Sequence, residues 1–152
     1  MTSELTAVSL MARRAVESQD WATVARCARE ILLRQQSSPE GHFLNGLVEK
    51  ASGRPVKALQ AFEQALALDA DRYDAAVEVA NQYSFARRNG EAAELLGRYS
   101  EKLHNSPVYL NLAGTVYTEI GMPQEAWLLF KKATELQPQV DLFQANLAAC
   151  DV

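Results

Sequence analysis

The chain has 152 residues, of which 48% are hydrophobic and 22% charged, and this is enough apolar material for one ordinary folded domain. Its net charge of −4 at pH 7 argues against a nucleic-acid partner, because such proteins usually carry a basic face. The two cysteines lie far apart and the two histidines have no partner at ligand spacing, so we predict no disulfide framework, no metal site and no cofactor.

The N-terminal segment does not have the order of a signal peptide, because Glu4 comes early and the arginines follow the apolar residues. The longest apolar runs are far shorter than the ~20 residues that a membrane span needs. We therefore expect a cytoplasmic protein that does not bind a membrane.

Capping and turn residues divide the chain into helices, and no segment alternates with period two over the length of a strand. Ser38 and Ser106 each precede a proline, which predicts an N-cap followed by the first helical residue. Gly53 and Gly121 predict helix ends and turns. The predicted helices lie near 4–18, 21–35, 39–52, 55–68, 73–87, 90–103, 107–120, 123–136 and 140–151.

The pattern recurs every 34 residues without an insertion. Small residues stand at one register position, namely Ala12, Gly46, Ala80, Gly114 and Ala148. The turn position seven residues later holds Gln19, Gly53, Arg87 and Gly121. Sixteen residues after the small residue stand Ala28, Phe62, Leu96 and Phe130. We expect the small residues to let two helices approach each other, and the aromatic or leucine to fill the space between neighbouring hairpins.

This order of small residue, aromatic, turn glycine, A-x3-F and proline resembles the tetratricopeptide repeat. The resemblance covers repeats at 5–38, 39–72, 73–106 and 107–140, of which the last matches best and the first is degenerate. It implies an all-α fold, a right-handed α-α superhelix of antiparallel helical hairpins, with 1–152 as a single array.

Residues 141–152 fit the first helix of a fifth repeat whose second helix is missing. This segment is either a terminal capping helix or the point where a longer protein has been cut. We favour the second reading, because a capping helix needs a polar outer face and Asp141 and Asp151 are the only charges here. The exposed apolar surface then predicts a homodimer through the C-terminal helix.

The sequence holds no Gly-rich phosphate loop, HExxH or GxSxG motif, so we predict no catalytic residues and no enzyme. The resemblance implies instead a concave groove that binds a partner peptide or protein. Asparagine amides could bond a peptide backbone and apolar residues could take a side chain, although packing on neighbouring helices is the alternative for each. The implied groove residues are Ser9, Arg13, Phe43, Leu47, Lys50, Val77, Asn81, Ser84, Asn111, Thr115 and Thr118.

Three functions stay open at this stage. The leading hypothesis is a protein-interaction scaffold, in the N-terminal part of a longer bacterial protein. The chain also resembles the repeat region that precedes the catalytic domain of bacterial sulfotransferases, and the small stand-alone chaperones of secreted proteins. A clamp for C-terminal carboxylates is disfavoured, because Asp74 and Glu78 would oppose an anionic tail.

Overall fold

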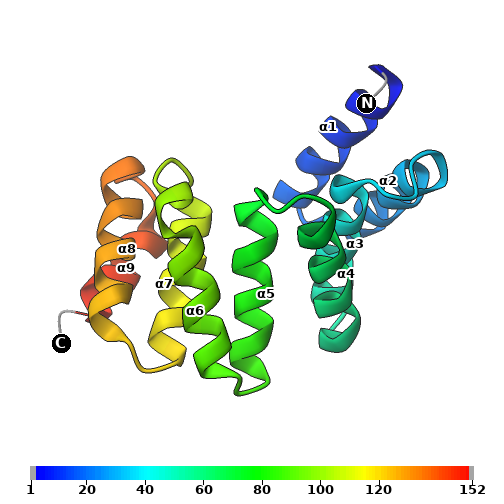
Figure 1. Ribbon diagram of the computed structural model, residues 1–152. Coiled ribbons are helices and arrows are strands. Elements are labelled where there is room, and N and C mark those ends of the chain that lie inside the picture. The colour runs from blue at the N-terminus through cyan, green and yellow to red at the C-terminus, as the bar shows by residue number, and fades with distance from the viewer. Residues whose placement is uncertain (1–2, 151–152) are drawn as a thin grey trace. The chain divides into compact units, whose positions relative to one another are not determined.

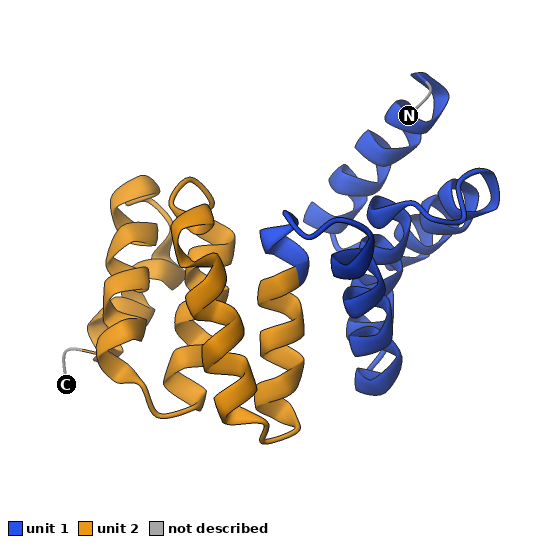
Figure 2. Ribbon diagram, in the orientation of Figure 1, with its two compact units in different colours: residues 1–75 blue, residues 76–152 orange. Residues whose placement is uncertain are grey.

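The computed structural model describes residues 3–150, and these form nine α-helices and one short 3-10 helix (Figure 1). The predicted all-α fold class of tandem helical hairpins is confirmed. The chain divides into two compact units, residues 1–75 and residues 76–152 (Figure 2), with helix α5 beginning in the first and continuing into the second. None of the described helices is long and apolar enough to cross a membrane.

The first unit contains two helical hairpins and the start of a further helix. Its helices are α1 (Ser3–Glu17), α2 (Trp21–Arg34), α3 (Pro39–Ala51), α4 (Pro55–Leu68) and the beginning of α5 (Tyr73–Phe85). These bounds follow the predicted ones closely, because prolines begin α3 and α4 and a residue between the two helices of each hairpin has a positive φ.

The core of the first unit centres on Phe43 and Phe62, which are fully buried with ring centroids 5.6 Å apart. A Cβ at Gly46 would lie 2.5 Å from the Phe62 ring, so only glycine allows α3 and α4 this close. We predicted that the ring would fill the space between neighbouring hairpins. The Phe62 ring lies against Gly46, the small residue of its own hairpin, and its contact with the neighbouring hairpin stays a prediction.

The second unit contains the rest of α5 and the helices that follow it. They are α6 (Asn89–Tyr99), the 3-10 helix η1 (Ser100–Leu103), α7 (Pro107–Glu119), α8 (Pro123–Leu136) and α9 (Asp141–Cys150). The predicted helix at 90–103 is therefore α-helical only as far as Tyr99, and the predicted end of the last helix at 151 lies outside the described residues. Gly114 repeats the close packing seen above, because a Cβ there would lie 2.6 Å from the Phe130 ring.

The turn inside each hairpin has one geometry at four positions 34 residues apart. The φ angles are 59° at Gln19, 74° at Gly53, 60° at Arg87 and 83° at Gly121. The next N–H bonds the carbonyl five residues back in every case: Asp20 to Ala15, Arg54 to Glu49, Arg88 to Tyr83 and Met122 to Tyr117, at 2.8–3.0 Å. This is the Schellman arrangement, which satisfies carbonyls at the end of the helix.

The two predicted serine caps behave differently. Ser38 Oγ accepts a hydrogen bond from the Gly41 N–H at 3.1 Å, so this cap is confirmed. Ser106 is the N-cap residue of α7 and is followed by Pro107 at the start of the helix, as predicted, but its side chain makes no cap hydrogen bond. The backbone of Ser106 (φ −123°, ψ 89°) also differs from that of Ser38 (φ −75°, ψ 118°).

Candidate functional site

The predicted lining of the first unit contains a charged cluster around Glu40 on α3. Its carboxylate accepts hydrogen bonds from Arg13 Nη2 at 2.6 Å, from Arg13 Nε at 3.1 Å and from Arg72 Nη2 at 3.1 Å. The Ser9 hydroxyl also donates to it, and Arg72 donates to both oxygens of Asp74 at 2.8 and 3.1 Å. We call Ser9, Arg13, Glu40, Arg72 and Asp74 the Glu40 network.

The Glu40 network keeps its charges in spite of burial. Burial alone would raise the pKa of Glu40, but the hydrogen bond and charge of Arg13, the Ser9 hydroxyl and the charge of Arg72 outweigh it and hold that pKa below its ordinary value. Burial would likewise lower the pKa of Arg72, and Asp74 and Glu40 raise it. The network contains two cations and two anions, so it offers no net charge to a ligand.

Phe43 lies beneath this network. The guanidinium carbons of Arg13 and Arg72 are 5.3 and 4.8 Å from its ring centroid, and the side chain is 0% exposed. A ligand could reach the ring only after one arginine had moved. Leu47 is also buried, and Lys50 is half-buried with interactions of its own. Arg13 is half-buried as well, with a side chain 42% exposed, so Arg13 and Lys50 are more accessible than Phe43 and Leu47.

The groove residues that we predicted on α5 are mostly buried. Val77 and Asn81 are buried, at 0% and 6% exposure. Ser84 is half-buried, and its hydroxyl donates to the Asn81 carbonyl at 2.7 Å. A role of these three side chains in ligand binding stays a prediction.

The side of α7 that we predicted to line the groove lies next to α9. Asn146 Nδ2 donates to Asn111 Oδ1 at 2.8 Å, which ties the two helices together. Next to this bond is a cavity of about 380 Å³, lined by Thr115, Thr118, Glu119, Pro123, Phe130, Asn146, Ala149 and Cys150. Two predicted groove residues, Thr115 and Thr118, thus open onto one hollow. We did not predict Asn146, although carrying the inner-face positions into the partial fifth repeat would have reached it.

The hydroxyl oxygens of the two threonines that line this cavity can accept hydrogen bonds from a ligand. Thr115 Oγ1 donates to the Asn111 carbonyl and Thr118 Oγ1 to the Gly114 carbonyl, both at 3.0 Å. Their protons are therefore used inside α7, and their lone pairs remain for an incoming N–H. The cavity is suited to polar recognition, with the Phe130 ring as an apolar wall.

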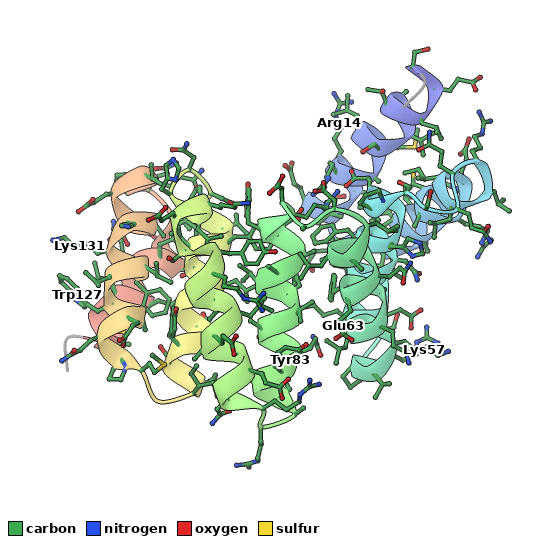
Figure 3. All side chains as sticks on the ribbon, viewed as in Figure 1. Arg14, Lys57, Glu63, Tyr83, Trp127 and Lys131 are labelled. Atoms are coloured by element: carbon green, nitrogen blue, oxygen red, sulfur yellow. The ribbon has the colours of Figure 1, made fainter. Side chains whose placement is uncertain are left out.

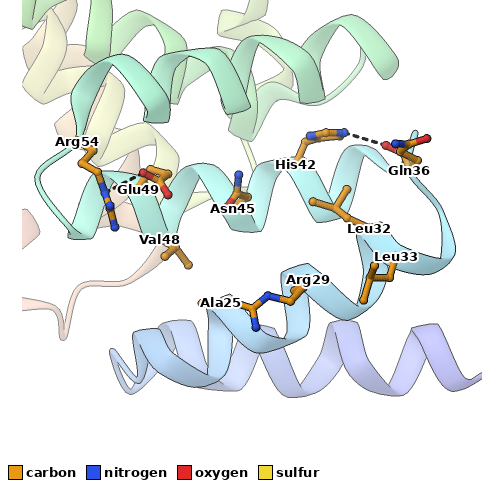
Figure 4. A pocket seen from close by; sticks show the side chains of 10 residues that line it. All are labelled: Ala25, Arg29, Leu32, Leu33, Gln36, His42, Asn45, Val48, Glu49 and Arg54. Atoms are coloured by element: carbon orange, nitrogen blue, oxygen red, sulfur yellow. Dashed lines mark hydrogen bonds and ion pairs between the residues drawn. The ribbon is translucent and has the colours of Figure 1, made fainter.

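A second cavity in the first unit lies outside the predicted lining, between α2 and α3 (Figure 4). The inner-face positions do not include its residues, so the repeat pattern gave no signal for it. Among residues 3–150, no group of three or more His, Cys, Asp or Glu side chains could hold a metal ion.

Comparisons with known proteins agree with the fold. A model of the tetratricopeptide repeat family matches residues 50–115. No curated protein sequence matches the chain. Among solved structures, PilF of Pseudomonas aeruginosa superposes with a TM-score of 0.75 at 18% identity, over 96% of this chain and 67% of that one. The tetratricopeptide protein TTC0263 of Thermus thermophilus gives 0.74 at 15% identity, over 97% and 81%.

MamA of Desulfovibrio magneticus RS-1 gives a TM-score of 0.68 at 15% identity, over 99% of this chain and 85% of that one. At such identities the superpositions show a shared fold alone. Residues 50–115 therefore match the tetratricopeptide repeat in sequence, and the chain has a fold that its structural neighbours share.

Proposed function

We propose that this protein is an interaction scaffold that holds an extended segment of a partner protein and performs no chemistry of its own. Tetratricopeptide arrays use the surface built by stacked hairpins for binding. The observation that carries the proposal is the 380 Å³ cavity between α7 and α9, onto which the predicted groove residues Thr115 and Thr118 open. Its volume is within the ~300–1,000 Å³ of ordinary ligand pockets.

The cavity chemistry suits a peptide backbone with a small or uncharged side chain. Thr115 and Thr118 present lone pairs that can accept peptide N–H groups. The Asn146 amide oxygen adds a further acceptor, since its nitrogen is bonded to Asn111. Glu119 is the one ionisable acid among the lining residues, so an acidic ligand side chain is disfavoured.

The first unit contributes a different kind of surface. Arg13 is partly exposed, but it is held by Glu40 and lies over Phe43. We propose that Arg13 and Lys50 contact the partner at the edge of the Glu40 network, while Phe43 and Leu47 support that surface from below. A cytoplasmic location remains part of this proposal.

The test is a peptide-display screen followed by affinity measurement. Among peptides selected on the wild type, those without an acidic side chain should bind Thr118→Arg at least tenfold more weakly, because Thr118 is exposed and a long charged side chain there would fill the cavity. Gln64→Arg, an exposed position on α4, is the matched control and should bind as the wild type does. Equal affinity of Thr118→Arg and the wild type would refute the assigned site.

We also propose self-association through α9. Phe143 is the buried residue of this helix, whereas Leu142 is 59% exposed. On the neighbouring α8, Leu128 is 53% exposed, and Trp127 is half-buried with Lys131 Nζ 5.0 Å from its ring centroid (Figure 3). Light scattering across a concentration series should show a dimer that Leu142→Glu weakens. A monomer at every concentration would contradict this.

A further inference from the structure

The second cavity has a volume of about 560 Å³ and belongs wholly to the first unit (Figure 4). It is lined by residues of α2, of α3 and of the turns that follow them. They are Ala25, Arg29, Leu32, Leu33, Gln36, His42, Asn45, Val48, Glu49 and Arg54.

This cavity lies on the face of α3 that points away from the predicted groove. Successive helical residues are rotated by about 100°, so His42, Asn45 and Glu49 occupy the side of α3 opposite to Phe43 and Leu47. The two surfaces therefore do not share side chains, and a ligand on one does not contact the other face of α3.

Two pairs of lining residues are already tied to each other. Arg54 Nε lies 3.0 Å from Glu49 Oε2, and His42 Nε2 donates to the Gln36 carbonyl at 3.0 Å. Figure 4 shows these two pairs at opposite ends of the cavity, with Asn45 between them. They fix the ends of the hollow and neutralise Glu49, which removes the one lining group that would repel an anion.

The groups that remain available are a guanidinium and an amide. Within residues 3–150, Arg29 has no ion-pair partner and the Asn45 side chain makes no hydrogen bond. An exposed arginine together with an amide nitrogen forms a donor set for one carboxylate. The lining carries Arg29 and Arg54 against Glu49, a formal excess of one positive charge on a chain whose net charge is −4.

The rest of the lining is aliphatic. Leu32 and Val48 form part of the wall, and Leu33 stands at the rim with 80% of its surface exposed. Leu32 cannot withdraw, because it is packed against Gly41, where a Cβ would be only 2.7 Å from Leu32 Cδ2. A ligand with an apolar part would remove this rim from water, which a free inorganic anion could not do.

We propose that this cavity is a second binding site, for a protein segment that carries an acidic side chain next to an aliphatic one. The carboxylate pairs with Arg29 and accepts from the Asn45 amide, and the aliphatic side chain lies on Leu33 and Val48. The unpaired guanidinium of Arg29 favours an acidic side chain and disfavours a basic one, and the exposed Leu33 favours an aliphatic side chain. A segment that carries both is therefore preferred over a purely apolar or a basic segment.

The experiment is selection of random dodecapeptides on the wild-type protein, with binding measured by fluorescence anisotropy. Selected peptides should include a class with Asp or Glu beside Leu, Ile or Val, and this class should bind Arg29→Glu at least tenfold more weakly. Replacing the peptide acid by lysine should restore binding to Arg29→Glu, a rescue that damage to the fold could not produce. The Asn45 side-chain amide resonances should shift when the peptide is added.

Two controls separate this site from other effects. Arg98→Glu makes the same charge change at an exposed position of α6 and should bind the acidic class as the wild type does. Thr118→Arg should also retain it, so failure of the α7–α9 site and failure of this one are distinguishable. A selection without an acidic-aliphatic class, or acidic peptides that bind Arg29→Glu and the wild type equally, would overturn the proposal.

Discussion

Glu40 accepts both donors of the Arg13 fork, Nη2 at 2.6 Å and Nε at 3.1 Å, and so joins α3 to α1 across 27 residues of sequence. This bidentate geometry is the strongest form of side-chain ion pair, and Arg72 reaches the same carboxylate from the segment before α5. The acid thus links the first helices of successive repeats on the side where a ligand was expected. Two residues that we predicted to line the groove, Ser9 and Arg13, thus connect α1 to α3 through Glu40.

The first prediction concerns Glu40→Gln. The substitution removes the charge and replaces one acceptor oxygen by an NH2 group that would face the guanidinium groups of Arg13 and Arg72, so we expect the unfolding free energy to fall by about 1–3 kcal/mol at pH 7. The folded-state pKa of Glu40 is below its ordinary value of 4.5, so its contribution is complete above that pH and is lost as pH falls through the folded-state pKa. Urea unfolding at several pH values should show wild type and variant converging in acid.

The control for this variant is Glu91→Gln. Glu91 pairs with Arg88 on the surface at 2.7 Å, with both side chains well exposed, and its loss should leave the urea midpoint nearly unchanged. If Glu40→Gln were as mild as Glu91→Gln, the Glu40 network would not stabilise the unit.

The second prediction compares three glycine-to-alanine variants. Gly46→Ala and Gly114→Ala place a methyl group within 2.6 Å of a buried phenylalanine ring, and we expect a net loss of about 1–2 kcal/mol in spite of the better helix propensity of alanine. Gly97→Ala on α6 meets nothing within 4 Å and should stabilise by about 0.5–1 kcal/mol. Thermal unfolding would measure all three, and stabilisation by Gly46→Ala would show that the ring can retreat.

The third prediction concerns the serine caps. Ser38→Ala removes a buried hydrogen bond to the Gly41 N–H and should cost about 1 kcal/mol. Ser106→Ala removes no cap bond and should be much milder. Chemical denaturation of the two variants side by side gives the comparison, and equal losses would mean that Ser106 caps α7 in solution.

The fourth prediction concerns the thiols. Cys27 is 3% exposed, and burial raises its pKa, so little thiolate is present at neutral pH and it should resist iodoacetamide in the folded protein. Cys150 is partly exposed and should be alkylated first. Labelling of Cys150→Ser reports Cys27 alone, and its rate should rise only in denaturant. Rapid native labelling of that variant would contradict the buried position.

The helices and their register were predictable because the signals are local and repeated. Proline at the first helical position and a turn glycine 14 positions later occur at Pro39 and Gly53 and again at Pro107 and Gly121, and the 34-residue spacing fixes the register of the third repeat, which has no proline at its helix starts. The change to a 3-10 helix after Tyr99 was not predictable, since Ser100 to Leu103 carry no residue that forbids an α-helix.

The candidate sites were predictable only in part. The inner-face positions placed Thr115 and Thr118 on one helix face, and the cavity beside them lies there. The same rule could not show that Phe43 is covered, because the covering arginines come from α1 and from the loop before α5. The pairing of Arg13 with Glu40 depends on how the hairpins stack. Sequence rules for side-chain pairs within one helix do not apply to residues 27 positions apart.

The four left-handed turn residues are all exposed, and two of them, Gln19 and Arg87, are not glycine. A shape that recurs with such different side chains is dictated by the helices on either side. A probe can therefore be attached at these turns. A fluorophore or spin label at residue 19 or 87 would extend into solvent and would not disturb the buried contacts between helices. Distances between such labels would report how far apart the two units are in solution.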